Sequence, residues 1–172
     1  LFEERELSVD ECAGYLQKAI NLLKSQTAAS DGSEGTLKVI ITVSPIRYAK
    51  YGYHGSQLSK ATLLLAADKL VKENPGVVSY FPAYEIMNDE LRDYRFYKED
   101  MLHPSEQAVE YIWERFRATY FGKAAEQFLE DWRPIREALG HKPFHPESEE
   151  HQKFIARTEE KKRQFEEKYH LL

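Results

Sequence analysis

Between residues 37 and 81 the chain has a short apolar strand, a long apolar helix and a second apolar strand, in that order. Consecutive β-branched residues predict the first strand at 37–43, and apolar runs predict the helix at about 57–72 and the second strand at 77–81. Such a unit is a right-handed crossover that joins parallel strands. The first strand is apolar throughout, which indicates that both of its faces are covered. The segment therefore predicts an α/β fold with a parallel sheet.

Two strands are too few for a stable parallel sheet of this kind. Nothing after Phe81 indicates another strand, so we expect the missing strands to lie upstream of Leu1 or to come from a second chain. Leu1 is not an initiator Met, and no signal-peptide pattern follows it. The sheet in this chain is therefore expected to be incomplete.

Helical periodicity predicts a helix on either side of the first strand. Ser8-Val9-Asp10-Glu11 has the spacing of a capping box, which predicts a helix from Ser8 to about Gln26. Loops are expected at 30–35 and at 48–55, the second just before the crossover helix. The apolar residues expected on the buried side of the crossover helix are Leu58, Ala61, Leu65, Ala66 and Leu70.

A helix that begins with a proline is expected after a long polar loop. Proline is favoured at the first helical position, and apolar periodicity continues from Pro104 to about Phe121. Its inward residues are expected to be Ala108, Ile112, Trp113 and Phe116. A further helix is expected from about Lys123, and Pro134 should end or kink it because proline lacks the N–H that continues a helix.

The last segment of the chain, at 147–170, predicts an amphipathic helix on a highly charged background. Such a helix is expected to lie on the domain or on a partner, and it offers a route to self-association. The expected organisation is therefore a domain at 1–121 and a helical extension at 122–172.

The composition excludes several classes of protein. The formal net charge of the 172 residues is −5 and the basic residues alternate with acidic ones, which argues against nucleic acid as a partner. The longest apolar runs, 39–43 and 63–67, are far shorter than the roughly 20 residues of a membrane-spanning helix. Cys12 is the only cysteine and is expected to be a small buried hydrophobe rather than a reactive thiol. A reducing compartment such as the cytoplasm is compatible with this cysteine content.

Asp100 and His103 are the strongest candidates for chemistry. A neutral imidazole can accept a proton from a hydroxyl group, and a carboxylate bound to its other nitrogen selects the tautomer and stabilises the imidazolium. The pair follows the second strand, and catalytic groups of α/β sheets gather at the carboxyl ends of strands. The same spacing at a helix start also fits a simple capping arrangement, and Glu99 is an alternative to Asp100 as the orienting carboxylate.

Four segments carry a resemblance to a known family. They are Thr42-Val43-Ser44-Pro45-Ile46-Arg47, Gln57-Leu58-Ser59-Lys60-Ala61, Tyr80-Phe81-Pro82-Ala83-Tyr84-Glu85, and Leu91-Arg92-Asp93-Tyr94-Arg95-Phe96-Tyr97 running into Asp100-Met101-Leu102-His103-Pro104-Ser105. In this order they resemble the C-terminal part of GSCFA-domain proteins, a family similar to the SGNH (GDSL-like) hydrolases.

The resemblance implies a fold and an activity. The fold is a three-layer α/β/α domain with a flavodoxin-like parallel sheet. The activity is that of a serine esterase or acyl hydrolase that needs no cofactor, with His103 as general base and Asp100 as its orienting partner. The substrate class it implies is a small molecule or an acylated carbohydrate.

The serine nucleophile of such an enzyme is unknown, because this chain has no Gly-Ser-Cys-Phe-Ala segment. Gly32-Ser33 and Gly55-Ser56 sit in predicted loops without a preceding apolar strand. Ser44 follows a strand, but Pro45 after it has no N–H to bind an oxyanion. The chain by itself is therefore expected to be inactive.

Other candidates are weaker. Arg47 and His54, on the loop after the first strand, could line the cleft and contact an anionic substrate, or they could simply be solvated. Arg92 and Arg95 suggest a surface ion-pair cluster with nearby acidic residues. His141 and His145 have the spacing of a helical metal pair, but Pro143 between them argues against a helix, and no metal site is expected. Tyr48, Tyr51 and Tyr53 could stack on a sugar ring or pack within the loop.

Two hypotheses of different classes follow. In the first, the chain is part of an SGNH-like ester hydrolase. In the second, it is a non-catalytic binding or assembly module that keeps the hydrolase fold and docks a partner through its C-terminal helix.

Overall fold

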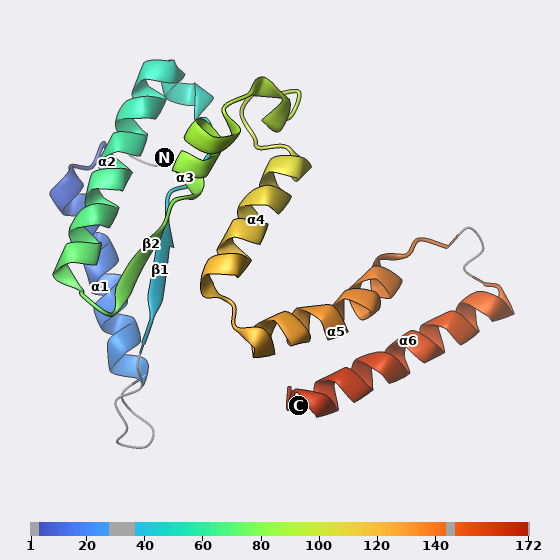
Figure 1. Cartoon of the computed structure of the whole chain (residues 1–172). Coiled ribbons are helices and arrows are strands. Elements are labelled where there is room, and N and C mark those ends of the chain that lie inside the picture. Colours follow the sequence, from blue (N-terminus) through green and yellow to red (C-terminus); the bar gives the residue numbers. More distant parts are fainter. Residues whose placement is uncertain (1–3, 28–36, 144–146, 172) are drawn as a thin grey trace. The chain divides into compact units, whose positions relative to one another are not determined.

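The computed structural model describes residues 4–27, 37–143 and 147–171 (Figure 1). The chain divides into two compact units, Leu1–Glu114 and Arg115–Leu172, and each is described by itself. The loop predicted at 30–35 lies outside the described residues.

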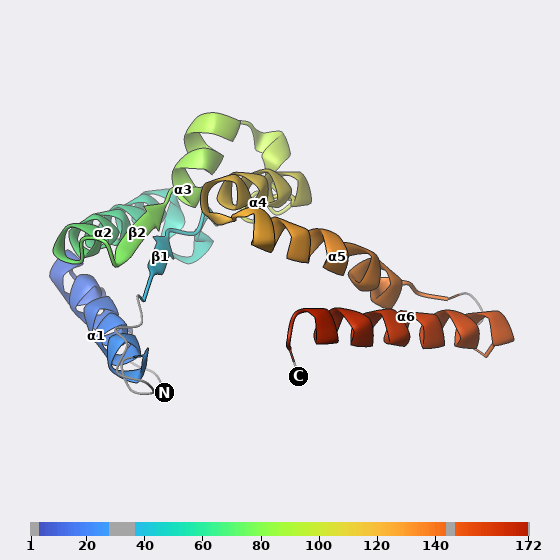
Figure 2. The same ribbon diagram turned by 60° about the horizontal axis from the view of Figure 1, so that its bottom comes forward.

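The N-terminal unit is built around the predicted crossover. Strand β1 (Val39–Thr42) pairs in parallel with β2 (Val78–Phe81), with Val39 opposite Val78 and Thr42 opposite Phe81. Helix α2 (Gly52–Glu73) connects the strands, and α1 (Val9–Thr27) packs beside it on the same side of the sheet (Figure 2). The structure confirms the α/β class and the parallel pair.

The start of α1 has both hydrogen bonds of the predicted capping box. The Ser8 N–H donates to Glu11 Oε2 at 2.9 Å, and the Glu11 N–H donates to Ser8 Oγ at 3.2 Å. These bonds satisfy two of the N–H groups that a helix leaves unpaired at its start. The helix then buries Ala13 and Ile20 in the main core, and Cys12 packs at the edge of that core.

The first strand differs from its prediction, because only one of its faces is covered within the described unit. Val39 and Ile41 pack against the core formed with α1 and α2, whereas Ile40 is 39 % exposed. Successive side chains of a strand point to opposite faces, so one helical layer covers only every second residue. The apolar run therefore did not reveal which face would be open.

Helix α2 buries Ala66 and Leu70 as predicted, but the rest of its inward face differs from the prediction. Its side chains at Ser56, Lys60, Ala66, Ala67 and Leu70 are buried. Leu58 and Leu65, expected inside, are 56 % and 57 % exposed. Small residues on the inward face let α2 approach α1 closely, and Ala13 of α1 lies in the same core.

After β2 the chain forms three short helical turns and a second small core. They are α3 (Ala83–Glu85), the π-helix η2 (Ile86–Leu91) and the 3₁₀ turn η3 (Tyr94–Phe96). The second core consists of Met87, Phe96 and Ala108. Beyond Phe81 the described residues contain no further strand, only an isolated antiparallel bridge between Tyr97 and Pro104.

Helix α4 (Glu106–Tyr120) begins two residues later than predicted. Pro104 belongs to the bridge with Tyr97, and the Ser105 hydroxyl accepts the Ala108 N–H at 3.3 Å. Ala108 and Ile112 face the second core as expected. Trp113 does not follow its prediction, because it is 37 % exposed.

The C-terminal unit consists mainly of two packed helices, α5 (Lys123–Gly140) and α6 (Glu149–Lys168). Pro134 was predicted to end or kink α5, and the helix does not end there. A proline removes one backbone hydrogen bond, and the helix continues here with Ile135 buried directly after it. Phe165 of α6 packs against Phe128 and Trp132 of α5, with ring centroids 4.9 and 5.2 Å apart. Self-association through α6 stays a prediction.

No helix in the described residues is long and apolar enough to cross a membrane.

Candidate functional site

A cavity of about 270 Å³ lies at the carboxyl ends of the two strands. One side comes from 45–47, directly after β1, and from the first half of α2. The other side comes from α3, η2 and the residues up to Tyr97, which follow β2. This is the position at which open α/β sheets bind their ligands.

Lys60 is a buried cation in the wall of this cavity. Lys60 is only 8 % exposed, and its Nζ donates to the Ser44 carbonyl oxygen at 2.6 Å. The ammonium also lies 5.9 Å from the centroid of the Tyr84 ring. Burial lowers the pKa of the Lys60 ammonium, because a charged group loses hydration in the interior.

Arg47 connects the end of β1 to the segment that carries Asp100 and His103. Its N–H donates to the Leu102 carbonyl at 3.0 Å, and Nη1 donates to the Met101 carbonyl at 3.2 Å. Its guanidinium lies 4.6 Å from the centroid of the Tyr53 ring. Arg47 is also one of the residues that line the cavity.

Arg92 lines the cavity because of the backbone geometry at the end of the π-helix η2. Its φ of 46° is in the left-handed region, and its N–H donates to the Met87 carbonyl at 3.2 Å. A π-helix in a protein frequently marks a functional site. Asp93 follows it in the wall, and its Oδ1 accepts the Arg95 N–H at 2.9 Å.

Asp100 and His103 form a hydrogen-bonded pair. His103 Nδ1 lies 2.6 Å from Asp100 Oδ2. The other carboxylate oxygen, Oδ1, accepts the N–H groups of Leu102 and His103 at 2.8 and 3.0 Å. These backbone bonds first, and the His103 side chain next, lower the pKa of Asp100 to about 2.

The pair does not cap a helix, which was the simpler alternative. Helix α4 starts at Glu106, and the Ser105 hydroxyl accepts an N–H of its first turn. Asp100 instead closes the loop before it and binds the imidazole with its second oxygen. A carboxylate on Nδ1 favours the tautomer whose Nε2 is an acceptor. Both side chains are about half exposed.

The GSCFA family model matches residues 1–116. The chain belongs to the GSCFA family. The model of the C-terminal domain of GSCFA domain proteins matches residues 132–172, a range that includes α6. No curated protein and no solved structure matches the chain significantly. The four segments on which the resemblance rested all fall within the first matched range of this GSCFA chain.

The two remaining cleft candidates of the GSCFA chain do not line the cavity. Ser44 is exposed, its Oγ accepts the Ile46 N–H at 3.3 Å, and its carbonyl holds Lys60. His54 is exposed in the first turn of α2, not on a loop as predicted. The sequence interpretation missed Lys60 and also treated Arg92 as part of a surface ion-pair cluster, although both lie in the cavity wall.

The Gly-Ser pairs provide no nucleophile in the described residues. Gly55-Ser56 is helical, and the buried Ser56 hydroxyl accepts the Tyr48 N–H at 3.1 Å. Gly32-Ser33 lies outside the described residues. So does His145, whereas His141 packs its ring 5.5 Å from Phe154. Within the described part of the chain, no group of three His, Cys, Asp or Glu residues could hold a metal ion.

Proposed function

We propose that this GSCFA protein works as an SGNH-like serine ester hydrolase, with His103 as general base and Asp100 as the residue that orients it. The observation that carries this proposal is the 2.6 Å contact between His103 Nδ1 and Asp100 Oδ2. The proposed fold of the complete domain is a three-layer α/β/α structure with a flavodoxin-like sheet, of which this chain forms the C-terminal part.

The proposed chemistry follows from the tautomer of His103. With Nδ1–H donated to Asp100, Nε2 accepts the hydroxyl proton of a serine as the serine oxygen attacks the ester carbonyl. The imidazolium that results is stabilised by the Asp100 carboxylate. It then returns the proton to the leaving alcohol as the tetrahedral intermediate collapses to the acyl-enzyme. Water releases the acyl group in a second round of the same proton transfers.

The position of the pair supports the same role. The Arg47 N–H binds the Leu102 carbonyl, so the loop that carries the pair contacts one residue of the cavity wall, although Asp100 and His103 do not themselves line the cavity. The serine itself is expected in the Gly-Ser motif of the family, which this chain does not contain. Substrates proposed for it are esters of small molecules or of carbohydrates.

The test is ester hydrolysis by the protein from the full coding sequence and by its His103→Ala variant. Loss of a general base lowers kcat by about 10²–10⁴-fold. The matched control is His54→Ala, which removes an exposed imidazole outside the cavity wall and should leave the rate unchanged. Equal rates for wild type and His103→Ala would refute the assignment.

A further inference from the structure

We infer that the cavity at the strand ends binds a hydroxylated ring compound with an anionic group, a sugar acid or a sugar phosphate, through Lys60, Arg47 and Arg92. The inference deepens the proposed function by naming its substrate class, and it rests on that function only for the step from ligand to substrate. Binding of the ligand needs neither His103 nor the serine.

The charge of the cavity wall favours an anionic ligand. Three cations line the cavity, and Asp93 is the only carboxylate among the described lining residues. No carboxylate in the described part of the chain lies within ion-pair distance of Lys60, Arg47 or Arg92. Asp93 itself binds the Arg95 backbone and lies 4.0 Å from the Arg95 side chain. The cavity therefore has an excess of positive charge that a ligand can neutralise.

The burial of Lys60 also favours an anionic ligand. A buried ammonium is unfavourable unless charge or hydrogen bonds replace its hydration. Its Nζ donates to one carbonyl, that of Ser44, and an ammonium has three donors. An anionic oxygen in the cavity would take the remaining donors. Arg47 and Arg92 add guanidinium groups, which bind carboxylates and phosphates in a bidentate manner.

The uncharged residues of the cavity wall favour a hydroxylated ring. Four tyrosines line the cavity, and aromatic rings pack well against the C–H surface of a sugar: Tyr53, Tyr84, Tyr94 and Tyr97. Gln57 uses Oε1 to accept the Tyr84 hydroxyl, which leaves its amide N–H groups as donors. Asn88 uses Nδ2 to donate to the Tyr84 carbonyl, which leaves its Oδ1 as an acceptor. Hydroxyl groups need both kinds of partner.

The size of the cavity limits the ligand. A volume of about 270 Å³ is just below the usual range of ligand pockets, which suits a single sugar ring. Phosphate and carboxylate share the chemistry of an anionic oxygen, so the test includes one ligand of each kind.

The experiment is calorimetric titration of the full chain with glucuronic acid, glucose 6-phosphate and glucose. We expect at least one of the acidic sugars to bind about tenfold or more tightly than glucose, because hydrogen bonds to charged groups are stronger than those between neutral groups. The acid that binds more tightly shows whether the cavity prefers a carboxylate or a phosphate. Equal affinities for all three sugars, or binding of none, would overturn the inference.

Variants separate the cavity from the general surface charge. Lys60→Met nearly keeps the length of the side chain and removes its charge. If Lys60→Met does not fold, Arg92→Gln replaces it as the test, because Arg92 is exposed. Each should weaken the acidic sugar about tenfold and leave glucose binding unchanged. The matched control is Arg95→Gln, which lies outside the cavity wall. Equal binding by Arg92→Gln and Arg95→Gln would contradict the inference.

The two proposals fail independently. If the acidic sugar binds selectively but the full-length protein hydrolyses no ester, the proposed function fails and the binding site stands. If His103→Ala abolishes hydrolysis while binding shows no preference for acidic sugars, the binding site fails and the proposed function stands.

Discussion

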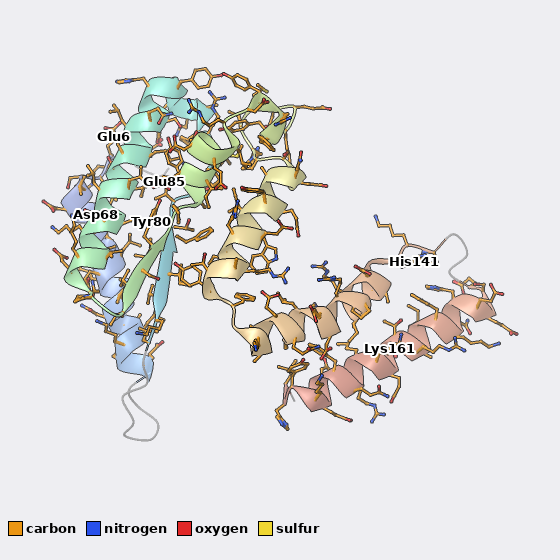
Figure 3. The ribbon with its side chains drawn as sticks, in the orientation of Figure 1. Glu6, Asp68, Tyr80, Glu85, His141 and Lys161 are labelled. Atoms are coloured by element: carbon orange, nitrogen blue, oxygen red, sulfur yellow. The ribbon has the colours of Figure 1, made fainter. Side chains whose placement is uncertain are left out.

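The two compact units of the chain treat charged side chains differently. In the N-terminal unit, Lys60 is buried beside a cavity and Asp100 binds an imidazole. In the C-terminal unit, the described charged residues stay at least partly exposed and form surface pairs such as Arg163 with Glu160. Lys161, labelled in Figure 3, is one of the exposed charges of α6.

This difference in the placement of charged side chains suggests that the N-terminal unit holds a functional site and that the C-terminal unit has a structural role. The C-terminal unit buries Phe165 among the rings of α5, and that packing needs no ligand to be stable. In the N-terminal unit, polar groups are held where packing alone would not put them. Tyr80 and Glu85, labelled in Figure 3, are a further example, since the Tyr80 hydroxyl donates to the Glu85 carboxylate at 2.9 Å. Function is therefore expected from the N-terminal unit.

The largest effect expected is on catalysis, from Asp100→Asn in the full-length protein. The amide keeps an oxygen for the Leu102 and His103 N–H groups, but it loses the charge that stabilises the imidazolium. We expect kcat to fall by about 10³–10⁴-fold with little change in KM. Steady-state ester hydrolysis measures both.

The control for Asp100→Asn is Glu99→Gln, which removes the neighbouring carboxylate that was the alternative orienting group. In the structure His103 contacts Asp100, so the rate of Glu99→Gln should equal that of wild type. A large loss in Glu99→Gln together with wild-type activity in Asp100→Asn would reverse the assignment.

The next largest effect is on stability, from Phe165→Ala in the C-terminal unit. Phe165 is 5 % exposed and contacts three rings, so its removal should destabilise this unit by about 3–5 kcal/mol. Hydrogen exchange measured by mass spectrometry separates the units. Exchange should accelerate in α5 and α6 and stay unchanged in α1 and α2.

Phe154→Ala is the control for Phe165→Ala, because Phe154 is on the same helix but 37 % exposed. Its effect should be much smaller. If Phe165→Ala accelerated exchange in α1 and α2 as much as in α5 and α6, the two units would not be independent, and the comparison would break.

Local signals in the sequence predicted much of the N-terminal unit. The Ser8 capping box and the parallel strands depend on neighbouring residues or on short connections, and each is confirmed. The Asp100–His103 contact was also predicted, because three residues of loop limit where the two side chains can go.

Features that depend on tertiary packing were not predicted. The inward face of α2 is chosen by its fit to α1, which favours Ala66 and Ala67 over the exposed Leu65. The same orientation of α2 places Lys60 in the cavity wall, and the apolar periodicity of the helix did not indicate that position. Arg92 is in the cavity wall because a π-helix ends there in a left-handed residue, and no local sequence pattern predicted the π-helix. At Pro134 the local rule allowed either an end or a kink, and the helix continues to Gly140.

A smaller effect is expected at the first turn of α1, from Ser8→Ala. The change removes the hydroxyl that accepts the Glu11 N–H, and loss of such a cap lowers stability by about 1 kcal/mol. Urea unfolding of the N-terminal unit measures it. Ser59→Ala is the control, because the Ser59 hydroxyl is exposed and has no hydrogen bond to another described residue. Equal midpoints for the two variants would mean that the capping box adds nothing.

The smallest effect expected is a pH dependence in the C-terminal unit. Asp131 Oδ2 accepts from Lys168 Nζ at 2.5 Å and from the Tyr169 hydroxyl at 2.6 Å, and these bonds lower the pKa of Asp131 from 3.8 to about 2. A carboxyl group whose pKa is lower in the folded protein stabilises the fold above its unfolded pKa. That contribution is therefore complete above about pH 4 and is lost as the pH falls through 2.

Asp131→Asn tests this sign directly. Its Tm should be roughly one or two degrees below that of wild type at pH 7, because the interaction is at the surface, and the difference should vanish near pH 2. Glu130→Gln, one residue away without a charged partner in the described residues, should show no such change between the two pH values. A difference that persisted at pH 2 would mean that Asp131 acts through packing. In that case the C-terminal unit would owe its stability to its aromatic core and not to its surface charges. The N-terminal unit differs, because it buries the charged side chain of Lys60.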